Sequence, residues 1–62
     1  MFTREQIAAR IAELEARAAR MAEQMANPPR FDTAEELATY TQIRQSDLRY
    51  CRFEAERLSK QL

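Results

Sequence analysis

Apolar residues in the first half of the chain recur with alternating spacings of four and three. Such a repeat puts one side chain per turn on the same side of a helix and is typical of heptad a and d positions. The second half keeps the spacing, although two of its positions are polar. The two seams are Ile7, Ile11, Leu14, Ala18, Met21 and Met25, then Leu37, Thr41, Arg44, Leu48, Cys51, Ala55, Leu58 and Leu62. The pattern predicts two amphipathic helices that pack through these seams.

One strong break separates the two patterns. Pro28 and Pro29 are adjacent, and the chain has no glycine. A proline disfavours helical dihedrals in the residue before it, so the first helix should end near Ala26. We predict a first helix over about residues 3–26, a corner over 27–32 and a second helix over about 33–61.

Both predicted helix starts carry capping residues. In a capping box a Thr or Asp side chain accepts from the third helical N–H, and the side chain at that third position reaches back. Thr3 and Gln6 fit the first start, with Phe2 and Ile7 at the positions of a hydrophobic staple. Two pairs fit the second start: Asp32 with Glu35, and Thr33 with Glu36.

A short corner between two heptad-patterned helices favours an antiparallel arrangement. We therefore expect an all-α fold, a single domain made of one antiparallel two-helix hairpin. At 1.5 Å per residue the second helix would be about 45 Å long and the first about 35 Å. The last turns of the second helix, RLSKQL at 57–62, should then overhang the hairpin.

The chain is short for a stable core, since its length is 62 residues. A single cysteine and no histidine leave neither an internal disulfide nor a zinc site to reinforce it. Association is the remaining source of stability. We expect the hairpin to form a homo-oligomer, a dimer that makes a four-helix bundle.

The second helix carries apolar residues outside its seam. Ile43, Tyr50 and Phe53 are spaced by seven and three, so they lie together on the side away from Leu48. Large apolar side chains grouped on an exposed side indicate an interface, whereas the alternatives are that the rings fold back over the hairpin or stand as single exposed residues. Three arginines surround them: Arg49, Arg52 and Arg57. We predict that these six residues bind a partner, either a second copy or a different protein.

Two other features have two interpretations each. A stripe of small residues on the first helix could admit a neighbouring backbone or could be alanine filling a neutral surface. Its members are Ala8, Ala12, Ala19, Ala22 and Ala26. In the second seam, polar Thr41 and Arg44 either specify the register, with the Arg44 charge reaching the rim, or mark a frayed end of the seam.

The residues that carry catalysis are missing. There is no glycine for a phosphate-binding loop and no histidine to activate Cys51, which we expect to be a buried structural thiol. The acidic residues stand beside basic ones at helical spacing, as in Glu13 with Arg17 and Glu56 with Lys60, and we expect surface ion pairs there. We predict that the protein is not an enzyme and holds no cofactor and no metal.

Charge and hydropathy narrow the partners. Ten basic and ten acidic residues cancel, which is unlike a strongly basic nucleic-acid binder. No apolar run is long enough to span a membrane, and the first residues lack the apolar core of a signal peptide. We expect a cytoplasmic protein that makes no use of a membrane.

Two resemblances bear on function. In length and in its hairpin of heptads the chain resembles Rop, the small plasmid RNA-binding protein whose hairpins dimerise into a four-helix bundle; this implies an RNA-binding dimer. The segment RFDTAEELATYTQIRQSDLRYCRFEAERL is similar to the final helix of phage head–tail joining proteins of the gpW type, which implies a small virion component. Those families carry a β-hairpin before that helix, for which Pro28 and Pro29 leave no room.

From the residues themselves we favour a non-enzymatic protein-binding module, an adaptor, chaperone or inhibitor that covers a surface on another protein. The alternatives are a Rop-like nucleic-acid binder and a phage head–tail joining component. Arginines next to Tyr50 and Phe53 fit either a protein hot spot or stacking on single-stranded nucleic acid. The zero net charge favours the protein partner.

Overall fold

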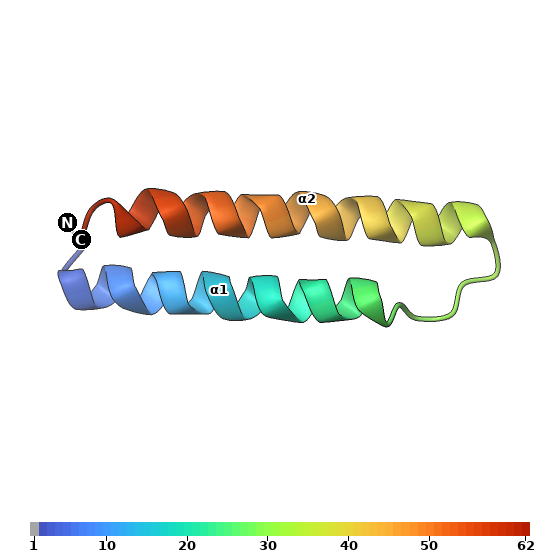
Figure 1. Ribbon diagram of the computed structural model, residues 1–62, viewed down its shortest axis with the longest axis horizontal. Coiled ribbons are helices and arrows are strands. Elements are labelled where there is room, and N and C mark those ends of the chain that lie inside the picture. The colour runs from blue at the N-terminus through green and yellow to red at the C-terminus, as the bar shows by residue number, and fades with distance from the viewer. Residues whose placement is uncertain (1) are drawn as a thin grey trace.

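The computed structural model describes residues 2–62, which form two helices side by side (Figure 1). Helix α1 spans Arg4–Ala26 and helix α2 spans Ala34–Ser59. They run in opposite directions, so the start of α1 and the end of α2 lie at the same end of a rod of 46 × 15 × 14 Å. The described residues contain no strand. The predicted all-α helical hairpin is confirmed.

Capping fixes both helix starts. The Thr3 hydroxyl accepts from the Gln6 N–H at 3.1 Å, and the Gln6 side chain accepts from the Thr3 N–H at 2.9 Å, so the predicted capping box forms. At the second start Thr33, not Asp32, is the cap, and its hydroxyl accepts from the Glu36 N–H at 3.1 Å. The prolines end α1 at Ala26, as the sequence predicts.

The core lies between the two helices. Leu14 and Cys51 are fully enclosed, which confirms the expected buried thiol. The core cluster consists of Leu14, Ala18, Met21, Cys51 and Ala55, with Ile11, Leu48 and Leu58 packed against it. The seam of α1 therefore faces α2 as predicted.

The seam of α2 is shorter than predicted. Leu37 is 38% exposed and Leu62 is 46% exposed, so the two ends of that seam do not belong to the core. Leu37 lies in the first turns of α2, beyond the end of α1, where no helical neighbour is present to cover it (Figure 1). Leu62 follows the end of α2, which stops at Ser59.

The predicted overhang of residues 57–62 is wrong. The Arg4 guanidinium donates to the main-chain oxygen of Leu62 at 2.7 Å, so the chain end lies beside the start of α1. The extra length of α2 projects at the corner instead (Figure 1). There the corner segment lies alongside the first turns of α2 (Figure 1). The ring centroids of Phe31 and Tyr40 are 5.2 Å apart, with an angle of 48° between the ring planes. This aromatic contact covers part of the projecting turns.

Neither α1 nor α2 has the length and hydropathy that a bilayer crossing needs.

Candidate protein-binding surface

Three large apolar side chains of α2 are open to solvent. Ile43 is 54% exposed, Tyr50 is 53% exposed and Phe53 is 64% exposed. In the same helix Cys51 and Ala55 are buried against α1. At about 100° per residue the three exposed residues lie within about 80° of one another, on the side away from that contact. The rings do not fold back over the hairpin core.

The exposed group belongs to a longer row. Reading outward from Ile43 with alternating steps of three and four gives a second heptad-like line along α2. Its members, here called the outer seam, are Glu36, Thr39, Ile43, Ser46, Tyr50, Phe53, Arg57 and Lys60. Every one of them is exposed. Hydrophobicity identifies the apolar members in the sequence, and Arg57 was predicted as their neighbour. The alternating spacing is the signal that reveals the remaining polar members, Glu36, Thr39, Ser46 and Lys60.

Arg57 is the predicted arginine most closely tied to the apolar residues. It shares a shallow hollow of about 160 Å³ with Phe53, Glu56 and Lys60. Its guanidinium donates from Nη2 to Glu54 Oε2 at 2.7 Å and from Nε to Oε1 at 3.2 Å. This bidentate geometry fixes the orientation of the Arg57 side chain within the outer seam.

The hydrogen-bonded contact between Glu54 and Arg57 shifts the pKa of both residues. The hydrogen bond from Arg57, assisted by the charges of Arg57 and Arg10, holds the pKa of Glu54 below its usual value despite partial burial. The hydrogen bond to Glu54 and the attraction of its carboxylate raise the pKa of Arg57. Arg10 comes from α1, so a charge on one helix acts on a carboxylate of the other.

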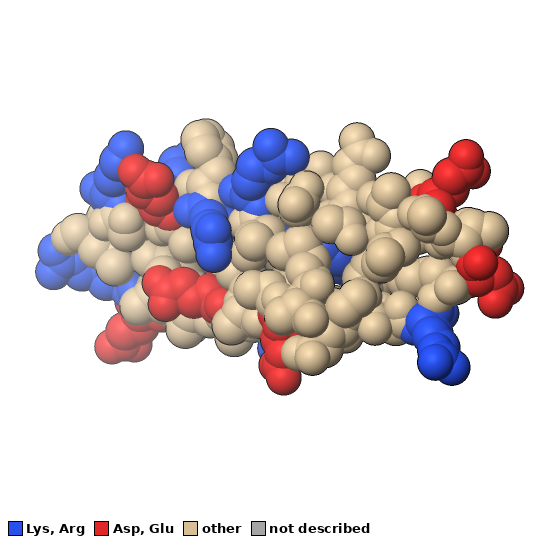
Figure 2. Space-filling model, turned by 45° about the vertical axis from the view of Figure 1, so that its right-hand side comes forward, with Lys and Arg blue, Asp and Glu red and all other residues tan. Residues whose placement is uncertain are grey.

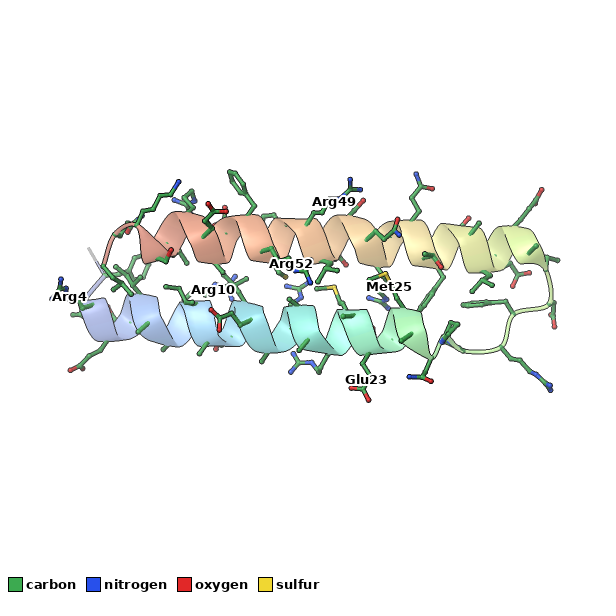
Figure 3. All side chains as sticks on the ribbon, viewed as in Figure 1. Arg4, Arg10, Glu23, Met25, Arg49 and Arg52 are labelled. Atoms are coloured by element: carbon green, nitrogen blue, oxygen red, sulfur yellow. The ribbon has the colours of Figure 1, made fainter. Side chains whose placement is uncertain are left out.

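Arg49 and Arg52 point elsewhere. Figure 3 shows Arg49 on the side of α2 away from α1. Arg52 lies between the helices in the same view. It lines an open groove of about 460 Å³ together with Leu14, Ala18, Cys51 and other residues of both helices. The structure therefore brings Ile43, Tyr50, Phe53 and Arg57 together and sets Arg52 apart from them.

The alanine stripe of α1 is only partly packed. Ala8, Ala12, Ala19 and Ala26 are exposed and Ala22 is half-buried. Ala19 and Ala22 line the same groove as Arg52. Their small side chains leave this groove open.

Ion pairing follows a spacing different from the predicted one. Within residues 2–62, the pairs closer than 4 Å are Arg10 with Glu13 and Arg57 with Glu54, both three residues apart. The expected pairs Glu13–Arg17 and Glu56–Lys60 do not form. Glu13 pairs instead with Arg10, which precedes it in the helix; Arg10 Nη1 and Glu13 Oε2 are 3.2 Å apart.

Charge changes sign along α2. Figure 2 shows acidic side chains at both ends of the rod, whereas most of the basic side chains on this face lie toward the middle and the end away from the corner. In α2 the first turn carries Glu35 and Glu36, and the last turn carries Arg57 followed by Lys60. The outer seam therefore begins acidic and ends basic.

The described residues contain no group of three His, Cys, Asp or Glu side chains able to hold a metal ion. Comparison of the chain with protein-family models, with curated proteins and with solved structures gives no match. The resemblances to Rop and to the gpW-type proteins thus depend on length, heptad pattern and the quoted segment alone.

Proposed function

We propose that this hairpin is a non-enzymatic protein-binding module that works by covering a surface on another protein chain, as an adaptor, chaperone or inhibitor does. The observation that carries the proposal is the exposed apolar group of α2. Ile43, Tyr50 and Phe53 stand side by side in solvent on a helix whose opposite side is already packed.

The chemistry of the group supports a protein partner. Tyr and Arg are enriched at the centres of protein interfaces because each combines a large contact area with a hydrogen-bonding end. Tyr50 and Phe53 provide the apolar area, and Arg57 is held beside them by Glu54. A bidentate pair that already fixes Arg57 lowers the entropy cost of ordering that side chain on binding.

The same proposal includes self-association into a dimer with four helices. The hairpin core is small, with five residues in its buried cluster. Chains of this size commonly need a further source of stability, and a second hairpin packed on α2 supplies it by burying apolar area.

The test is capture by the immobilised full chain. We expect the wild-type chain to retain a protein in stoichiometric amount, and the Tyr50→Ala/Phe53→Ala variant to lose it. Hot-spot aromatics commonly contribute ~2 kcal/mol or more each. Phe2→Ala is the matched control, because it removes a ring that is 77% exposed and lies outside the outer seam.

Two results would contradict the proposal. One is equal retention of proteins by the wild-type chain and the double variant, with circular dichroism showing both folded. The other is retention of RNA that weakens steeply as salt rises, since counterion release marks phosphate contacts. That second result would assign the chain to the nucleic-acid alternative.

A further inference from the structure

We propose that the chain covering the outer seam is a second copy of this protein, with its α2 antiparallel to the first and a two-fold axis at the level of residue 48. This inference rests on the proposed function and names its partner. It also fixes an arrangement, with the two α2 helices in the centre and the two α1 helices outside.

The spacing of the outer seam suits an antiparallel contact with a second copy. Its positions 36, 39, 43, 46, 50, 53, 57 and 60 are symmetric about residue 48. Read backwards, they show the same alternation of three and four. Reversing the helix therefore places an outer-seam residue of one copy opposite an outer-seam residue of the other at every level. A two-fold axis needs such self-complementarity, because each contact occurs twice.

The residue chemistry fits this direction. In the antiparallel arrangement Ile43 lies opposite Phe53 of the second copy, and Ser46 lies opposite Tyr50 of the second copy. The first of these layers buries two of the most exposed apolar side chains of the hairpin against each other. In the second layer a small side chain faces a large one, so the Tyr50 ring has room to pack beside the axis. Its hydroxyl can stay at the rim of the contact.

A parallel arrangement would match the sizes less well. It would place Ser46 opposite Ser46 of the second copy and Tyr50 opposite Tyr50. One level of the contact would then hold two small side chains and the next level two large ones. The antiparallel direction distributes the volume evenly, which favours close packing on both sides of the axis.

Charge complementarity acts at the two ends of the seam. Glu36 falls opposite Lys60 of the second copy, and the acidic first turn of α2 meets the basic last turn that contains Arg57. A parallel arrangement would place Glu36 on Glu36 and Lys60 on Lys60. Like charges brought together are unfavourable, so the parallel alternative is disfavoured at both ends.

The exposed area of the hairpin is sufficient for such a contact. Its accessible surface is 5092 Å², about 900 Å² more than the roughly 4,200 Å² of a compact monomer of this mass. A standard interface buries about 800 Å² on each partner. One contact along α2 therefore removes roughly the excess that the elongated hairpin leaves in water.

Charge reversal tests the partner and the direction together. Sedimentation equilibrium would be run on the wild-type chain, Glu36→Lys, Lys60→Glu and the double variant. We expect each single reversal to raise the dimer Kd about tenfold, because it makes two repulsive contacts per dimer. The double variant should return to about the wild-type Kd. Residues 36 and 60 of one chain are about 36 Å apart along the helix, so the rescue must come from the other copy.

Glu23→Lys is the matched control for this series. Glu23 points away from α2 (Figure 3), and its reversal should leave the Kd unchanged. Circular dichroism of each variant shows whether the helices persist. Any loss of helix stability from a Lys in the first turn of α2 is shared by Glu36→Lys and the double variant, so it cannot imitate the rescue.

A distance measurement checks the direction independently. In a Cys51→Ala background, spin labels at Arg49→Cys, an exposed position outside the outer seam, should lie within about 20 Å of each other across the dimer. Labels at Lys60→Cys should lie roughly 35–40 Å apart. A parallel dimer would bring both pairs close together and would overturn the proposed axis.

A second copy is also ruled out if the wild-type chain stays monomeric at about 1 mM, or if the double reversal does not restore the dimer. Failure here is distinct from failure of the proposed function. A monomeric chain that captures a different protein through Tyr50 and Phe53 overturns the second copy and keeps the binding module, whereas a monomeric chain that captures none overturns both.

Discussion

The Arg44 guanidinium lies over the ring of Tyr40, with its central carbon 5.1 Å from the ring centroid. Arg44 occupies a seam position of α2, where an apolar residue is expected. Its Nε is enclosed and makes no hydrogen bond with the described protein atoms. The Nε side of the guanidinium is therefore enclosed beside the Tyr40 ring.

Replacing Arg44 with Leu should stabilise the hairpin by about 1 kcal/mol. An enclosed polar atom without a partner costs about 1–3 kcal/mol, and the lost cation–π contact is worth about 0.5–1 kcal/mol. Urea unfolding followed by circular dichroism at fixed chain concentration measures the change. Arg49→Leu is the control, because Arg49 points away from α1 (Figure 3) and should change stability little. A less stable Arg44→Leu chain would show that the guanidinium is a net stabilising group.

The Phe31 and Tyr40 rings should stabilise the corner as a pair. Their centroids are 5.2 Å apart in a tilted arrangement, for which coupling energies of about 0.5–1.5 kcal/mol are typical. We expect a double-mutant cycle of Phe31→Ala and Tyr40→Ala to return a coupling in that range. Phe2→Ala removes an equal ring from an exposed site and should show no coupling with Tyr40→Ala. Additive losses at Phe31 and Tyr40 would mean that the corner does not depend on their contact.

Local signals in the sequence predicted the hairpin well. Thr3 with Gln6 marks the start of α1, Pro28 and Pro29 mark the corner, and each helix ends within two residues of its predicted end. These features act through neighbouring residues, so they can be recognised without tertiary information. The overhang depends on how one helix is placed along the other, which is decided by contacts between residues far apart in the sequence. The Arg4 contact with Leu62 shows the placement that results.

The limits of the α2 seam illustrate the same difference. Leu14→Ala should destabilise the hairpin by about 3 kcal/mol, because Leu14 is 1% exposed in the centre of the core. Leu37→Ala should cost less than ~1 kcal/mol, although Leu37 follows the same heptad spacing, because it lies beyond the end of α1. Thermal unfolding of both variants at equal concentration compares them. Similar losses would place Leu37 in a buried contact.

The candidate surface could be predicted only in part. Hydrophobicity and spacing identified Ile43, Tyr50 and Phe53, since their direction on a helix follows from sequence position alone. Arg52 was grouped with them because it is adjacent to Phe53 in the chain. Neighbouring residues on a helix point about 100° apart, and this rotation carries Arg52 to the groove that Cys51 and Leu14 line.

The Glu54–Arg57 pair should make stability depend on acid pH. The hydrogen bond from Arg57 lowers the pKa of Glu54 in the folded chain, so near and below pH ~4.3 the unfolded chain binds more protons at this residue. Its contribution is present above the unfolded pKa and is lost as pH falls through the folded one. The free energy of unfolding of the wild-type chain should therefore fall more steeply between pH ~5 and ~3 than that of Glu54→Gln. Glu23 points away from α2 (Figure 3), so Glu23→Gln should keep the pH dependence of the wild-type chain. Equal slopes for the wild-type chain and Glu54→Gln would show that the bidentate contact does not persist in solution.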